Sequence, residues 1–245
     1  MKNVLRTFAA LLGAAALIGH GPAAHAQMVI GSGKVVTESR AVSGFQAIES
    51  RGAVKLVLRQ GSREGIELGG EDNILPLIET RVVDRDGVPT LEIGPKRGTM
   101  FTTRSPLTAA VDLVTLKAIA MSGGGSLASE ALKTPSLKLA LSGSANVKLR
   151  QLSVDELSVN VSGSGELEFG GKATRLAVSI SGSGDVNSRA LEADDVSVSV
   201  AGSGDANVTA RKTLNVSIAG SGSVVYAGDA VVKSSIAGHG SVRKQ

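Results

Sequence analysis

A short motif of small residues, with glycine at its second position, recurs seven times in the C-terminal half of the chain. The copies begin at Ser122, Ser142, Ser162, Ser181, Ala201, Ala219 and Ala237, so 18 to 20 residues separate each copy from the next. A unit of this length cannot bury its own apolar face, and it must therefore pack against its neighbours. The fixed spacing predicts a stack of equivalent units.

Strict alternation of apolar and polar residues precedes the motif in the repeats. Leu157, Val159 and Val161, for example, alternate with Ser158 and Asn160. A period of two with β-branched residues on one side is typical of a strand with one buried face. The glycines then supply the backbone conformations that a tight corner needs. We therefore predict two short strands and two turns in each repeat.

Stacking equivalent strands about 4.8 Å apart aligns equivalent residues in continuous columns. One predicted inward column comprises Leu137, Leu157, Leu176, Val196, Leu214 and Val232, and another comprises Leu141, Val161, Ile180, Val200, Ile218 and Ile236. Crossovers between parallel strands are overwhelmingly right-handed. We therefore expect an all-β fold, a right-handed parallel β-helix (β-solenoid) with coils of 18–20 residues. A β-meander or sandwich is the alternative, but its hairpins would space equivalent residues irregularly.

The first 26 residues are typical of a secretory signal peptide. Lys2 and Arg6 precede an apolar stretch at 8–18, and Ala24-His25-Ala26 offers small residues for cleavage. The apolar stretch is shorter than the roughly 20 residues that a membrane span needs. We expect cleavage after Ala26, which would deliver the mature chain to the periplasm or the exterior without a membrane span.

The mature chain, residues 27–245, is expected to form one solenoid domain. Regular repeats occupy 122–245, and less regular coils are expected over 27–121, since no Pro/Ser-rich linker separates the two parts. Residues 72–78 could open a short helix with Asp72 or Asn73 as its cap.

The N-terminal part of the mature chain also resembles a known family. The residues that carry the resemblance are Arg40, Val42, Phe45, Ile48, Gly52, Val54, Gln60 and Gly61, with Gly31-Ser-Gly33 upstream and the Ser-Gly repeats downstream. With these the chain resembles the head GIN domain family, whose members are described as "putative auto-transporter adhesins". The resemblance implies an exported, β-helical bacterial protein of the adhesin type.

The chain lacks the residues of common catalytic and metal sites. It has no cysteine, and His239 is the only histidine after residue 26. A Ser-His-Asp site would need that histidine beside a nucleophile, whereas its position inside the last motif copy indicates a corner residue. Zinc sites of the His/Cys type are excluded. We predict no catalytic residues, no cofactor and no enzymatic activity. A polysaccharide-acting enzyme is the least favoured alternative, because the acids lie without a nearby column of Arg or Lys.

One column of acids could bind calcium. Glu166, Asp185 and Asp205 each follow a motif copy, so the stack would place the three carboxylates about 5 Å apart. Such proximity is repulsive unless a cation neutralises it, and Ca²⁺ prefers oxygen ligands. The simpler interpretation is that the side chains diverge into solvent.

The outward side of the alternating strand is the candidate binding face. Its residues are small, polar and uncharged: Ser158, Asn160, Ser179, Ser197, Ser199, Asn215, Ser217 and Ser235. Such a face could bind a cell-surface polysaccharide or a protein, or it could simply keep an exposed sheet soluble. The interspersed charge argues against nucleic acid as a partner. We therefore expect a non-enzymatic binding or adhesion module. The alternative is a structural protein that forms homo-oligomers through the ends of its solenoid.

Overall fold

The computed structural model describes residues 28–245, and the predicted signal peptide lies outside them. The described chain is nearly all β-structure, with one short 3-10 helix, η1 (Leu75–Leu77). No helix within 28–245 has the length and apolar character needed to cross a membrane.

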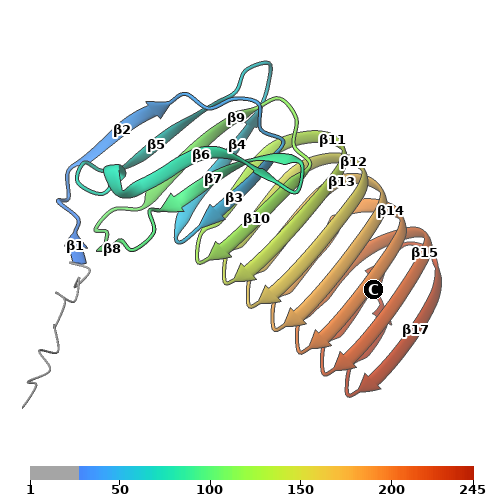
Figure 1. The fold of residues 1–245 in the computed structure, drawn as a ribbon. Helices are drawn as coiled ribbons and strands as arrows, with labels where there is room; N and C mark the ends of the chain where they lie inside the picture. Colours follow the sequence, from blue (N-terminus) through green and yellow to red (C-terminus); the bar gives the residue numbers. More distant parts are fainter. Residues whose placement is uncertain (1–27) are drawn as a thin grey trace, which may run out of the picture.

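Five long strands form the regular part of the solenoid. They are β11 (Ser126–Gly143), β12 (Asn146–Gly163), β13 (Glu166–Gly182), β14 (Asp185–Gly202) and β15 (Ala206–Gly220). Each pairs in parallel with the next, and residues at equivalent positions of the repeat lie side by side. Each strand follows the whole circumference of one coil, and a short turn leads to the next (Figure 1). The predicted parallel β-solenoid is confirmed.

Each coil has three faces rather than the two strands that we expected. In β12 the alternation of buried and exposed residues breaks at Arg150-Gln151 and again at Asp155-Glu156, where two adjacent residues are exposed. We call the segments face 1 (inward Val147 and Leu149), face 2 (inward Leu152 and Val154) and face 3 (inward Leu157, Val159 and Val161), and use these names for the equivalent segments of every coil. Face 2 was missed because it contains only two inward residues and no glycine motif.

The two predicted inward columns are formed as expected on face 3. Leu157 pairs with Leu137 and Leu176, and Val161 pairs with Leu141 and Ile180. The members from coils β11 to β15 are buried, while Val232 and Ile236 in the last coil are partly or largely exposed. In Figure 1 the near strands, which are those of face 3, run toward the lower left while successive coils advance toward the lower right, which is a right-handed winding.

The glycine motif marks the corner between face 3 and face 1. Gly163 has a φ of 131°, and a Cβ at this position would lie 2.3 Å from the backbone oxygen of Gly143 in the preceding coil. Glycine is therefore required both by conformation and by the close approach of stacked backbones. A Cβ on Gly124, the middle residue of its corner, would meet no atom within 4 Å. This open position explains why serine and histidine also occur there.

Charges on face 2 alternate in sign from coil to coil. Asp155 and Glu156 on β12 are followed by basic residues on β13, by acids on β14 and by Arg211 and Lys212 on β15. Arg175 of β13 pairs with Glu156, and the Lys212 Nζ lies 2.8 Å from an oxygen of Asp194. In the observed register, opposite charges of successive coils therefore lie next to each other.

The remaining strands precede or follow the regular coils. They are β1 (Met28–Ile30), β2 (Val35–Arg40), β3 (Ala47–Arg51), β4 (Val54–Gln60), β5 (Gly65–Glu71), β6 (Ile78–Arg85), β7 (Val88–Pro95), β8 (Met100–Thr102), β9 (Leu107–Leu113), β10 (Ala118–Gly123), β16 (Ser223–Ala227), β17 (Val231–Gly238) and β18 (Ser241–Lys244). Sixteen of the strands in the described chain belong to one sheet, in which the order β18-β16-β15-β14-β13-β12-β11-β10-β3-β7-β6 forms the longest path.

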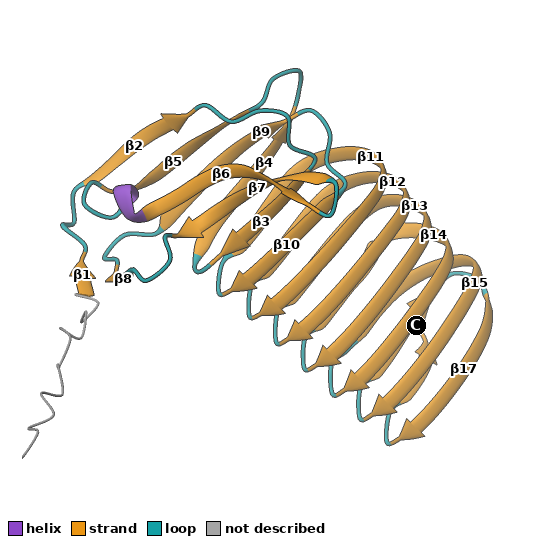
Figure 2. Ribbon diagram, viewed as in Figure 1, coloured by secondary structure: helices purple, strands orange, loops and turns teal. Residues whose placement is uncertain are grey.

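The N-terminal part is only partly made of coils, which corrects our expectation for residues 27–121. Strands β3 and β4 pair in parallel with β10 and β11, so they form a coil beneath the regular stack. Strands β7 and β9 extend the parallel pairing by one more layer. Beyond them the pairing is antiparallel, β6 with β7 and β2 with β5. Figure 2 shows that the longer loops lie in this part, whereas the regular coils have short turns.

The predicted short helix at 72–78 is present as η1, but its predicted cap is wrong. Ile74 precedes the helix, and no side chain caps it. Asp72 and Asn73 instead accept hydrogen bonds from the Oγ and backbone N–H of Ser32, at 2.6 and 2.9 Å. Their side chains fasten the beginning of the described chain to the η1 turn.

Candidate functional site

The predicted binding residues form two outward columns on face 3. Asn160, Ser179, Ser199, Ser217 and Ser235 are successive partners in one column. The second column contains Ser158, Ser197 and Asn215, with Ala177 between the first two. The structure therefore brings the predicted residues together on one side of the molecule. It adds lysines at the two ends of the second column, Lys138 and Lys233.

Face 3 is hollowed in two places. A hollow of about 370 Å³ is lined by Ala120, Ala140, Asn160 and Ser179, among others, and it reaches Glu49 at its far end. A second hollow of about 280 Å³ lies over Ser197, Ser199, Asn215, Ser217 and Ser235. The small side chains make these depressions, because larger groups would fill the space between neighbouring strands. Sequence reasoning missed Glu49, Ala120 and Ala140.

The alternation of apolar and small residues in 118–121 was a sequence signal from which face 3 could have been predicted to extend toward the N-terminus. Ile119 and Met121 are buried and alternate with Ala118 and Ala120, and the first motif copy follows directly. Glu49 had no such signal, because β3 precedes β10 by some 70 residues and yet pairs with it.

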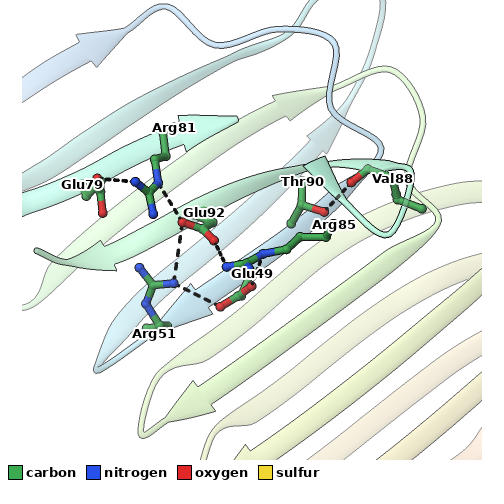
Figure 3. A network of polar contacts seen from close by, with 8 residues as sticks. All are labelled: Glu49, Arg51, Glu79, Arg81, Arg85, Val88, Thr90 and Glu92. Atoms are coloured by element: carbon green, nitrogen blue, oxygen red, sulfur yellow. Dashed lines mark hydrogen bonds and ion pairs between the residues drawn. The ribbon is translucent and has the colours of Figure 1, made fainter. Parts of the chain in front are cut away.

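A network of charged side chains closes the N-terminal end of face 3 (Figure 3). The Glu92 side chain is fully buried and lies among three arginines. The Arg81 Nε donates to a Glu92 oxygen at 2.9 Å, Arg85 pairs with the other oxygen, and the Arg51 Nη1 lies 3.8 Å away. Glu49 adds a second acid, 3.1 Å from the Arg51 Nη1.

This network keeps Glu92 ionised despite its burial. Burial alone raises the pKa of Glu92, but the hydrogen bonds and charges of Arg81 and Arg85 outweigh that effect, so the net pKa lies below the ordinary value. The hydrogen bond to Glu92 and the nearby Glu79 raise the pKa of Arg81. Each charge therefore has a partner, which indicates a structural joint between β3, β6 and β7 rather than a reactive group.

The acid column proposed for calcium has another role in two of its coils. The Asp185 Oδ1 accepts the backbone N–H of Asp205 at 3.1 Å, and the Asp205 Oδ1 accepts that of Ser223 at 2.8 Å. One coil earlier, the backbone N–H of Asp185 donates instead to the backbone carbonyl of Gly165. The aspartates thus replace a backbone acceptor at the corner. Over residues 28–245, no group of three or more His, Cys, Asp or Glu side chains is arranged to hold a metal ion.

His239 occupies the open middle position of the last corner. Its backbone N–H donates to the carbonyl of Gly220 at 2.8 Å, and its side chain is exposed. This placement is that of the serines in the other corners.

The residues that carry the family resemblance have architectural roles. Arg40 donates to the carbonyls of Ile78 and Leu75 at 2.7 and 2.9 Å, which satisfies groups at the η1 turn. Gln60 donates to the carbonyl of Lys133 and accepts its N–H, so it joins β4 to the coil above. Phe45 is buried in the core. These residues therefore fix how the N-terminal part meets the repeats.

Gly31-Ser-Gly33 wraps around a buried carboxylate that sequence reasoning did not find. Glu71 accepts the backbone N–H of Gly33 at 3.0 Å, and those of Arg104 and Ser105 at 2.5 and 2.7 Å. The Gly33 hydrogen bond is the largest cause of a lowered pKa at Glu71. A Cβ on Gly31 would overlap the Glu71 carboxylate, so glycine is required there.

Residues 44–230 match the model of the family described as "Putative auto-transporter adhesin, head GIN domain". A search of curated proteins finds no match.

Several solved structures share the fold. A putative adhesin from Bacteroides fragilis is 24% identical, with a TM-score of 0.81, and the match covers 89% of this chain and 100% of that one. A putative adhesin from Parabacteroides merdae is 25% identical, with a TM-score of 0.71, over 89% and 99% of the two chains. A structure from Parabacteroides distasonis named a putative lipid binding protein is 24% identical, with a TM-score of 0.74, over 89% and 100%.

Proposed function

Because this chain belongs to the head GIN domain family, we propose that it is an exported, non-enzymatic adhesion module that binds a neutral surface polysaccharide through face 3. The observation that carries the proposal is the uninterrupted outward column of small polar side chains on face 3, from Asn160 to Ser235. The predicted signal peptide at 1–26 supports export.

The chemistry of face 3 favours a neutral, hydroxyl-rich ligand. Serine hydroxyls both donate and accept hydrogen bonds, and asparagine amides do the same, so they match the hydroxyls of a sugar chain. Successive coils repeat these groups at about 4.8 Å, which suits an extended polymer more than a compact small molecule. Faces 1 and 2 carry ionised side chains at equivalent outward positions and are less suited to this ligand.

Two substitutions in the same coil test the proposal. Ser199→Arg places a long charged side chain in the hollow on face 3, and Asn187→Arg places the same side chain on face 1 of β14. We expect the unmodified protein and Asn187→Arg to bind one or more neutral glycans on a glycan and cell-wall array, and Ser199→Arg to lose at least about tenfold in affinity. Binding to none of the glycans, or equal loss by both variants, would contradict the proposal. If the protein bound purified proteins but none of the glycans, the ligand of face 3 would be a protein rather than a polysaccharide.

A second candidate function is self-association through the last coil. Among the described residues no strand covers the far side of β17, where Val231 is 68% exposed and Ile236 is 43% exposed. Light scattering after size-exclusion chromatography tests this candidate. A dimer that dissociates on the substitution Ile236→Lys would support self-association through the last coil. A monomer at micromolar concentration would exclude it.

A further inference from the structure

The corner between face 2 and face 3 holds a hollow at the first regular coil. Its volume is about 580 Å³, and Lys117, Lys133 and Lys138 line it together with apolar groups of Val88, Ala118 and Pro135. Three cationic side chains from two adjacent coils therefore surround one depression. The backbone N–H of Lys138 donates to the carbonyl of Lys117 at 2.9 Å, and Lys138 lies beside Ala118, the residue that follows Lys117.

None of the three lysines forms an ion pair within the described chain, where an ion pair means a nitrogen within 4.0 Å of a carboxylate oxygen. Their neighbours in the stack explain why. Lys133 pairs in register with Ser153, and Lys138 pairs with Ala118 and Ser158. No acid stands at the position where the next coil could supply one.

In the later coils, basic side chains on the same side of the solenoid are neutralised by acids of the neighbouring coil. Arg175 pairs with Glu156, and Arg211 lies 3.5 Å from Glu192. The neighbouring hollow, of about 550 Å³, shares Lys133 and contains both Lys172 and Asp155, yet Asp155 forms no ion pair with either lysine. The positive charge of the lysine hollow is therefore not neutralised by a carboxylate. The repulsion between the three ammonium groups decreases when an anion enters.

We propose that this lysine hollow binds a phosphate monoester carried on a small polyol or sugar. A phosphate monoester carries a charge of about −1.5 to −2 at pH 7, which three ammonium groups balance better than the single charge of a carboxylate. Lysine binds phosphate as a point charge and needs no fixed fork geometry. The apolar groups of Val88, Ala118 and Pro135 offer a surface for the carbon skeleton of the ligand. This site goes beyond the proposed function, because its ligand is anionic and its centre lies at the corner rather than on face 3.

Titration with glycerol 1-phosphate, followed by NMR shifts of the backbone amides in low salt, tests the site directly. We expect saturable shifts at 115–118 and 133–138, which weaken as salt rises because the attraction is electrostatic. The triple variant Lys117→Ala, Lys133→Ala, Lys138→Ala should bind at least about tenfold more weakly. The matched control, Lys55→Ala, Arg63→Ala, Lys96→Ala, removes the same charge from exposed positions outside the hollow and should change the affinity less than about threefold.

Vesicles distinguish the two sources of such an ester. Phosphatidic acid in phosphatidylcholine presents the monoester on a lipid, and phosphatidylcholine alone is the control. A lipid-borne ligand is supported if the unmodified protein co-sediments with phosphatidic acid vesicles, the lysine triple variant does not, and the free ester does not bind. Binding of the free ester alone supports a soluble or polymer-borne ligand. Equal weakening by both triple variants, or no saturable response to either probe from the unmodified protein, would overturn the proposal. Ser199→Arg should leave this binding unchanged, so the failure of one proposal does not imply that of the other.

Discussion

The regular coils and the N-terminal part achieve the same parallel stacking by different means. In β11 to β15 the interior is mostly aliphatic, and glycine corners let the backbones approach closely. In the N-terminal part, single polar contacts fix segments that would otherwise diverge, with Glu92 between β3, β6 and β7, and Glu71 between the first residues and the 103–105 loop. Stacking can therefore rest on repetition in one part and on individual buried charges in another.

The largest expected effect is at a corner glycine. Gly163→Ala forces a side chain into a positive φ and against the Gly143 carbonyl. We expect the free energy of unfolding to fall by about 4 kcal/mol or more, measured by denaturant unfolding.

Gly124→Ala is the matched control within the same motif. Its Cβ would meet nothing within 4 Å, and its φ is not in the positive range. The expected change is below about 0.5 kcal/mol. If Gly163→Ala and Gly124→Ala had the same unfolding midpoint, the explanation of the repeat motif would be wrong.

The next effect concerns the buried network of the N-terminal part. Glu92→Gln removes the charge that three arginines share, and we expect a loss of about 3 kcal/mol in the free energy of unfolding. Glu156→Gln, which breaks the exposed pair with Arg175 on face 2, should cost at most about 1 kcal/mol. Comparable losses would show that the two parts do not differ in the way described.

At low pH the N-terminal part should lose stability before the regular coils do. The folded-state pKa values of Glu71 and Glu92 lie below the ordinary 4.5, so their contribution to stability is present above pH 4.5 and is lost as the pH falls through the lower folded values. The pKa values of Glu38 and Asp72 in the N-terminal part shift in the same direction, whereas in the repeats the hydrogen bond from Lys212 lowers the pKa of Asp194. Hydrogen exchange between pH 7 and pH 3 should show amides of 31–105 losing protection first. Uniform loss along the chain would count against this account.

The smallest effect is expected at the aspartate that replaces a backbone acceptor. Asp205→Ala leaves the Ser223 N–H without its partner at an exposed corner, and we expect a cost of about 0.5–1 kcal/mol. Asp205→Asn keeps an oxygen at that position and should cost less. Thermal melting with and without a chelator then checks the alternative role of this column, since a bound calcium ion would make the midpoint sensitive to chelation.

The repeats could be predicted from sequence because every determinant recurs. Leu157 and Val161 reappear as equivalent residues one coil later, so a single pattern defined the strands, the columns and the outward residues of face 3. Face 2 was hidden because its inward pair, such as Leu152 and Val154, gives too short an alternation. The N-terminal contacts could not be predicted, because the partners of Glu71 are backbone groups 33 to 38 residues away and leave no repeated signal.

Because the chain contains no cysteine, the proposed binding of a glycan on face 3 can be tested directly with single cysteine variants. Single variants Ser179→Cys on face 3, Asn187→Cys on face 1 and Ser153→Cys on face 2 can each be coupled to a bulky maleimide, and binding to a captured glycan can be compared before and after coupling. The account predicts that coupling at Ser179→Cys abolishes binding while coupling at the other two positions leaves it intact. Full binding after coupling at Ser179→Cys, or loss only after coupling on face 1 or face 2, would contradict it.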